Sequence, residues 1–101
     1  MIQGTTPTHT FGLPFTADNV KDVMIAYVQN REVVFRKETK DCVFIDSEIQ
    51  VDLTQEDTFS LSHLSLVTIE FMALTSNNKV VGKKFNDIKV EETINKAVFK
   101  I

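Results

Sequence analysis

Side chains branched at Cβ dominate this sequence and limit what it can fold into. Val, Ile and Thr make up 31 of the 101 residues and Phe adds eight more, whereas Leu and Ala contribute only six and four. Branched side chains lose rotamer freedom in a helix but pack well on a pleated sheet. The composition therefore predicts an all-β protein, and the length allows one domain that buries a real core.

Strand-like segments separated by turn residues follow one another along the chain. We expect strands at residues 5–11, 20–29, 33–37, 42–46, 49–53, 64–74 and 80–90, the last with a bulge or a break at Asn86-Asp87. About seven strands with a turn roughly every ten residues are typical of an immunoglobulin-like antiparallel β-sandwich, and a small barrel is the alternative. The sandwich is predicted to cover residues 1–90.

A C-terminal tail at residues 91–101 is expected to follow the sandwich. Its apolar residues stand at helical spacing: Ile94, Ala97, Val98 and Ile101. This pattern is too short to hold a helix, so the tail is predicted to be loose.

The two long strands indicate which residues form the core. Residues 20–29 are apolar on both faces, so this strand is expected at the centre of its sheet. In 64–74, alternate residues from Val67 to Ala73 are expected to face the core. Asn77-Asn78 is predicted to make a hairpin turn with positive φ at two positions.

A short helical turn is predicted at residues 54–59. Thr54 can accept a hydrogen bond from the Asp57 amide while the Asp57 carboxylate reaches back, which is the arrangement of a capping box. Phe59 is then expected to drop into the core.

Side chains suited to catalysis are few and far apart. His9 and His63 are expected at the surface or rim, and Ser62 cannot pair with His63 because neighbouring strand residues point to opposite faces. Cys42 is the single cysteine and is expected to be a plain buried thiol. The sequence therefore predicts no catalytic, cofactor-binding or metal-binding residues, and a protein that is not an enzyme.

The charge balance argues against nucleic-acid and membrane partners. The formal net charge is −3 and the pI is about 5.3, whereas binding to phosphates needs clustered Lys and Arg. The basic cluster Lys79, Lys83 and Lys84 is interpreted as a solvated hairpin. No apolar run is long enough to span a bilayer, and Met1–Gly4 lacks the features of a signal peptide.

Two segments carry a resemblance to known proteins. They are Ile2–Phe11 (IQGTTPTHTF), continued by Leu13-Pro14-Phe15, and Val51–Thr58 (VDLTQEDT). With the strand order around them, they resemble small uncharacterised proteins encoded in phages and prophages of Gram-positive, clostridia-like bacteria. The chain is more distantly similar to the small N-terminal β-domains of phage baseplate proteins. After Thr58, the segment FSLSH replaces a more polar, glycine-containing turn of that pattern.

The resemblance implies a structural role in the virion or tail. We therefore expect a non-enzymatic structural or adaptor module that binds other virion proteins or itself, located in the bacterial cytoplasm before assembly and then in the virion. Leu66, Met72 and Leu74 are the candidate contact residues, although additional core on the second face of a central strand explains Met72 and Leu74 equally well.

Two other function classes stay open at this stage. A small ligand- or carbohydrate-binding β-domain is the alternative, but the sequence has no Trp and a single Tyr, Tyr27, on an expected central strand. An enzyme is the third class, and it would need a cleft that brings His9, His63 or Cys42 together.

Overall fold

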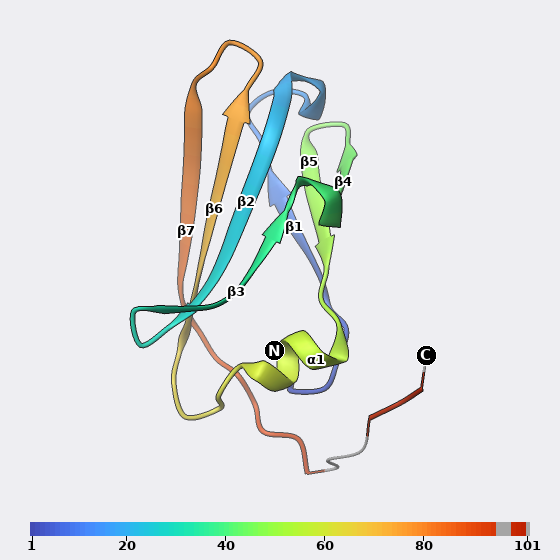
Figure 1. Cartoon of the computed structure of the whole chain (residues 1–101), viewed down its shortest axis with the longest axis vertical. Coiled ribbons are helices and arrows are strands. Elements are labelled where there is room, and N and C mark those ends of the chain that lie inside the picture. The colour runs from blue at the N-terminus through green and yellow to red at the C-terminus, as the bar shows by residue number, and fades with distance from the viewer. Residues whose placement is uncertain (95–97, 101) are drawn as a thin grey trace.

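Seven strands and one α-helix make up the part of the chain that the computed structural model describes, residues 1–94 and 98–100 (Figure 1). The strands are β1 (Thr8–Gly12), β2 (Val20–Gln29), β3 (Glu32–Glu38), β4 (Cys42–Ile45), β5 (Glu48–Asp52), β6 (Val67–Thr75) and β7 (Val80–Ile88). Helix α1 spans Gln55–Ser60, and single 3-10 turns at Ala17–Asn19 and Thr39–Asp41 lead into β2 and β4.

The strands form two antiparallel sheets that pack face to face. The smaller sheet has the order β1-β5-β4 and the larger has the order β3-β2-β6-β7. The predicted antiparallel β-sandwich of about seven strands is therefore confirmed, and the strands do not close into a barrel. Strand β2 lies between β3 and β6, as its two apolar faces predict, and β1 is an edge strand that begins directly after Pro7.

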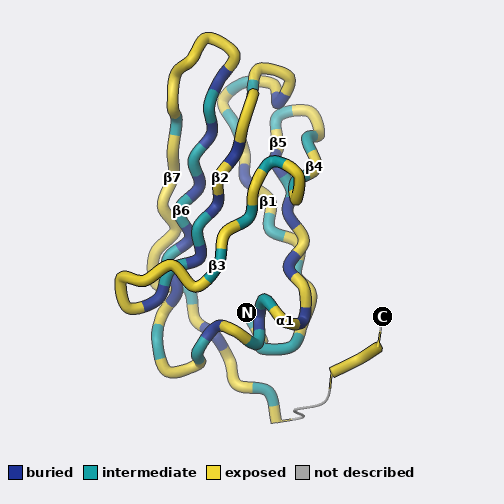
Figure 2. The backbone as a smooth tube through the Cα atoms, in the orientation of Figure 1, coloured by how far each residue is buried: buried dark blue, intermediate teal, exposed yellow. Residues whose placement is uncertain are grey.

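The core lies between the sheets and follows the alternation of the central strands. Figure 2 shows buried and less buried residues alternating along β6, and the buried residues on β2 occupy the same inner face. Across the core, the Phe11 ring on β1 stacks on the Phe71 ring on β6 with a centroid distance of 4.8 Å. The inner face of the larger sheet is therefore sealed by the smaller one, whereas its outer face is left open.

The N-terminal segment passes from one sheet to the other. Ile2 forms a parallel bridge with Glu91, just beyond β7. At Gly4 the backbone adopts φ of +81°, and it then crosses to pair β1 with β5. A Cβ at this position would lie 2.6 Å from the Phe59 ring, so both the conformation and the close contact require glycine.

Helix α1 connects the two sheets and has the predicted capping box. The Thr54 hydroxyl accepts from the Asp57 N–H at 3.0 Å, and the Asp57 carboxylate accepts from the Thr54 N–H at 2.8 Å. The prediction for Phe59 is wrong: its ring lies half-buried against Gly4. Thr58 and Leu61 are the fully buried residues here, because the helical turn directs them, not Phe59, between the sheets.

Strand β6 begins at Val67, three residues later than predicted. The Gln29 side chain holds the preceding loop, because its Nε2 donates to the carbonyls of Ser62 at 2.7 Å and Ser65 at 3.0 Å. Its Oε1 accepts from the Ser62 N–H at 2.9 Å. These bonds satisfy the backbone without a partner strand, so the loop does not need to join the sheet.

The turns differ in detail from the predicted ones. Asn30 and Arg31 have φ of 53° and 65° and form a two-residue turn between β2 and β3. In the β6–β7 hairpin only Asn78 has positive φ, because the Thr75 N–H bonds to the Lys79 carbonyl at 2.8 Å and leaves a three-residue loop. The predicted two-position turn at Asn77-Asn78 is therefore wrong.

The predicted irregularity near the end of β7 is a bulge. The pairing with β6 shifts by one residue between Phe85 and Ile88, and Asp87 has φ of 60°. Strand β7 ends at Ile88, and Val90 is buried outside the strand. Two of the four tail residues that stand at helical spacing in the sequence, Ala97 and Ile101, lie outside the described residues.

Candidate functional site

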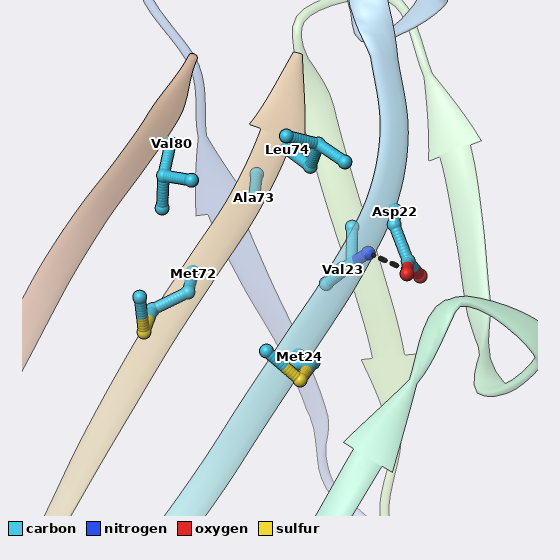
Figure 3. A pocket seen from close by; sticks show the side chains of 7 residues that line it. All are labelled: Asp22, Val23, Met24, Met72, Ala73, Leu74 and Val80. Atoms are coloured by element: carbon cyan, nitrogen blue, oxygen red, sulfur yellow. Dashed lines mark hydrogen bonds between the residues drawn. The ribbon is translucent and has the colours of Figure 1, made fainter. Parts of the chain in front are cut away.

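An apolar patch lies on the outer face of the larger sheet. We define the outer-face patch by Met24 on β2, Met72 and Leu74 on β6, and Val80 on β7. Figure 3 shows these side chains standing around a hollow of about 210 Å³. The pairing of strands brings them together, because Met24 lies opposite Met72 and Leu74 lies opposite Val80.

The patch is open to solvent. Met24 is 54% and Val80 is 60% exposed, while Met72 and Leu74 are intermediate. The alternative explanation of Met72 and Leu74 as additional core is therefore wrong, because no described segment covers this face. Methionine side chains are flexible and polarizable, and they adapt to irregular apolar partners.

Only two of the three predicted contact residues belong to the patch. Leu66 is 53% exposed but lies in the loop before β6, near the hairpin between β2 and β3, where the Asn30 side chain donates to the Ser65 hydroxyl at 3.1 Å. Met24 and Val80 also belong to the patch and are not among the residues predicted from the sequence. The apolar second face of residues 20–29 was the signal for Met24, whereas Val80 joins only through the register of β6 with β7.

A group of polar and aromatic side chains lies inside the sandwich. His9 faces inward from β1, and its Nδ1 lies 2.7 Å from the hydroxyl of the fully buried Tyr27. His9 itself is only partly buried, which agrees with the predicted rim position. Burial lowers the pKa of His9, with a smaller effect of the Met1 amino group, and burial likewise raises the pKa of Tyr27. Both groups are accordingly neutral near pH 7.

An ion pair anchors helix α1 to the larger sheet. Lys37 on β3 lies 2.6 Å from the Asp57 carboxylate. Partial burial alone would raise the pKa of Asp57. The hydrogen bonds from Lys37 and Thr54, with the charge of Lys37, instead hold that pKa below its usual value. The carboxylate is therefore an ionised structural group, already occupied by its partners.

The remaining candidate side chains lie apart. Burial raises the pKa of Cys42 to about 11, so it is a thiol, and its Sγ donates to the Glu38 carbonyl. His63 is exposed, with its Nε2 3.4 Å from the Glu92 carboxylate. Within residues 1–94 and 98–100, no three side chains of His, Cys, Asp or Glu are grouped so that they could hold a metal ion.

A groove opens between the edge strands β1 and β7. Its volume is about 660 Å³, and its lining includes His9 and Phe11 from β1 and Phe85 and Ile88 from β7. Lys83 spans the same side of the sandwich by donating to the Gly12 carbonyl at 2.8 Å. This lysine of the predicted solvated cluster therefore ties the two sheets together.

The two segments that carry the resemblance contact each other. The Gly4 N–H donates to the Thr58 hydroxyl, which donates in turn to the Thr5 carbonyl, each at 2.8 Å. The Leu53 N–H donates to the Pro7 carbonyl at 2.9 Å. Both segments thus build one structural joint between the N-terminus and α1.

Comparisons with known proteins return no relatives. No family model matches the chain, and the searches of curated proteins and of solved structures find no significant match. In the described ranges, no helix is long and apolar enough to cross a membrane.

Proposed function

We propose that this chain is a non-enzymatic structural or adaptor module of a phage or prophage, and that it acts through protein–protein contacts. The outer-face patch carries the proposal. It places four apolar side chains from three strands on one open sheet face, around a hollow that fits an apolar side chain of a partner.

Polar groups suited to chemistry are engaged in holding the fold. His9 binds Tyr27, Asp57 binds Lys37, and the Cys42 thiol has a raised pKa. A group with its partners already satisfied contributes rigidity rather than reactivity. A rigid sandwich with one apolar face suits an assembly role, and the resemblance to phage proteins suggests the virion or tail as the assembly.

Binding to structural proteins encoded beside its gene tests this function. Purified chain would be assayed by biolayer interferometry against each capsid, tail and baseplate protein of the same phage or prophage. We expect one partner that Met72→Glu weakens at least tenfold, since a charge would have to be buried in an apolar contact. Thr68→Glu, on the same face of β6 but outside the patch, is the matched control and should change binding little.

The proposal fails if none of these proteins binds the chain and light scattering shows a monomer at all concentrations. It also fails if a partner binds but Met72→Glu and Thr68→Glu weaken binding equally, since the patch would then have no part in the contact.

A small-ligand-binding domain is the second candidate, favoured by the groove between β1 and β7. Its volume lies within the roughly 300–1,000 Å³ typical of small-molecule sites, and Phe11, Phe85 and Ile88 make its walls apolar. Tyr27, the single Tyr, is fully buried, so an apolar ligand fits better than a carbohydrate. A thermal-shift screen with apolar ligands tests this role. Stabilisation that Phe85→Glu abolishes would support it, and the absence of any shift would oppose it.

A further inference from the structure

The two sheets differ in width, and the groove between β1 and β7 lies on the side where the smaller sheet is short of a strand. The smaller sheet has three strands with β1 at its edge, and the larger has four with β7 at its edge. Ile69, Phe85 and Ile88 of the larger sheet line the groove, and Phe85 is 39% exposed. The larger sheet therefore keeps an apolar inner surface that β1 does not cover.

The backbone of β1 presents hydrogen-bonding groups along this groove. The Leu53 N–H bonds to the Pro7 carbonyl, so every second residue of the strand from Pro7 onward directs its backbone groups to β5. The N–H and C=O groups of Thr8 and Thr10 therefore point the opposite way, along the free edge of the strand. Residues 7–11 all line the groove, as expected for a strand that borders it with its edge.

Positive charges lie at both ends of the groove. The Lys83 Nζ donates to the carbonyl of Gly12, which is the next residue on the same free edge. The Met1 amino group lines the groove near the opposite end, where it donates to the Lys89 carbonyl at 3.0 Å. None of the described residues that line the groove is Asp or Glu. An occupant with acidic residues at its ends therefore complements the charge of this site.

We propose that the groove is a docking site for an extended segment of a partner protein, which adds to β1 as a fourth strand of the smaller sheet. The segment is apolar at the alternate positions that face the larger sheet, polar between them and acidic at its ends. Backbone pairing gives affinity in this mode of recognition, and the contacts of alternate side chains give specificity. The groove and the outer-face patch lie on opposite sides of the larger sheet, so this site is additional to the one proposed above.

An extended segment accounts for more of the groove than a small apolar ligand does. A small apolar ligand covers Phe85 and Ile88 but displaces water from the backbone groups of Thr8 and Thr10 without replacing their hydrogen bonds. A free strand edge is instead a template for another strand. The smaller sheet is antiparallel throughout, so an antiparallel segment that pairs with Thr8 and Thr10 places its alternate side chains over the larger sheet.

The first test titrates the blocked peptide Glu-Val-Thr-Val-Thr-Val-Glu into the full-length chain and follows amide chemical shifts. Its threonines are designed to lie opposite Thr8 and Thr10, with its valines toward Phe85 and Ile88. We expect saturable binding with the largest shifts on β1 and β7. The same peptide N-methylated at both threonines loses its donors to β1 and should bind at least about tenfold more weakly. A peptide with lysine in place of both glutamates should bind at least about threefold more weakly.

Paired variants of the chain separate backbone pairing from folding. Thr10→Pro removes an N–H that faces the groove and not β5, so it should weaken peptide binding at least about tenfold, whereas Thr10→Val keeps this N–H and should bind like wild type. Urea denaturation establishes that both variants fold. If Thr10→Pro does not fold, Phe85→Glu takes its place and should abolish binding. Its control is Val43→Glu, at a 54% exposed apolar position of β4, which should leave binding unchanged.

Each other outcome has a definite meaning. No binding of the peptide would overturn the docking site. Equal binding of the N-methylated peptide would show that the groove takes apolar groups without backbone pairing, and it would overturn the added strand. Equal binding of the lysine peptide would overturn the acidic partner. Dimers of the chain that Thr10→Pro abolishes would place a second copy on this edge instead of a partner protein. Met72→Glu should leave peptide binding unchanged, so failure of this site is distinguishable from failure of the outer-face patch.

Discussion

The two ends of the chain reach the same helix and are held there in different ways. The N-terminal segment, residues 1–7, is tied to Thr58 through Gly4 and Thr5, and the Gln3 side chain donates to the Leu61 carbonyl at 2.8 Å. The C-terminal arm, by which we mean the described residues 98–100, meets α1 through the amide of Gln55.

Apolar content does not explain which end joins the fold. The N-terminal segment is mostly Gly, Thr, Pro and Gln, yet it is an integral part of the sandwich, whereas the arm carries Val98 and Phe99 and leaves both exposed. The N-terminal segment instead has matched hydrogen-bond partners and a glycine where no other residue fits. The number of hydrogen bonds to the rest of the fold and the close contact at Gly4, rather than apolar content, therefore distinguish the integrated N-terminal segment.

The largest effect is expected for Gly4→Ala. The added Cβ meets the Phe59 ring at 2.6 Å and the residue must keep φ near +81°, so we expect a loss of about 3 kcal/mol in the free energy of unfolding. Urea denaturation measures it. Gly12→Ala is the control, because no atom lies within 4 Å of the Cβ there, and its cost should be below about 1 kcal/mol. Equal losses in the free energy of unfolding at both glycines would show that the contact between Gly4 and Phe59 has no special structural role.

The second-largest effect is expected for Thr58→Val, with a loss of about 2 kcal/mol in the free energy of unfolding. Valine fills the same volume but removes the hydroxyl that pairs with Gly4 and Thr5, and it leaves two partly buried backbone groups without this partner. Thr10→Val, on the exposed face of β1, provides the comparison and should be nearly neutral. If both substitutions were neutral in urea denaturation, the hydroxyl would have no structural role.

Asp57→Asn tests the ion pair and the capping box that anchor α1. We expect it to lower the free energy of unfolding by about 1–2 kcal/mol at pH 7. The pKa of Asp57 is lowered by folding, so the stability from its ionised form is present above the ordinary aspartate pKa of about 3.9 and is lost as the pH falls through the lowered value. The difference between wild type and variant in urea midpoints should therefore shrink below about pH 4. A constant difference down to pH 2 would show that the charge is not involved.

Deletion of residues 95–101 is expected to have the smallest effect and to lower the free energy of unfolding by less than about 1 kcal/mol. Among the residues of this segment that the structure describes, it removes the two hydrogen bonds to Gln55 and the side chains of Val98 and Phe99, which are exposed. Thermal unfolding of the full-length and shortened chains measures the difference. A loss of stability as large as that expected for Gly4→Ala would show that both ends of the chain contribute equally to the stability of the fold.

Local patterns predicted most of the fold. Alternation located the core residues of β6, and the two apolar faces of β2 predicted its central position. The spacing of Thr54 and Asp57 predicted the capping box, because it depends on residues near in sequence. The start of β6 and the position of Phe59 were not predictable. They depend on Gln29 and Gly4, which contact them across 33 and more residues.

The candidate site was less predictable than the fold. Met72 and Leu74 stand out because they are outward apolar residues of one strand, but Met24 and Val80 become their neighbours only through the pairing of three strands. Gln55 carried no signal, because a glutamine at the start of a helix is ordinary until the chain end that it holds is known. The contact of His9 with Tyr27 was not predictable, because Tyr27 lies on the other sheet.

The bridge between Ile2 and Glu91 also has a consequence for synthesis of the protein. The Glu91 N–H donates to the Met1 carbonyl at 2.8 Å, and the Gln3 N–H donates to the Glu91 carbonyl at 3.0 Å. These bonds cannot form until Glu91 has left the ribosome, so residues 1–3 stay without these partners while residues 4–90 are translated. A nascent chain stalled before Glu91 therefore has an N-terminal segment that lacks its parallel bridge, and this contact between distant parts of the chain closes late.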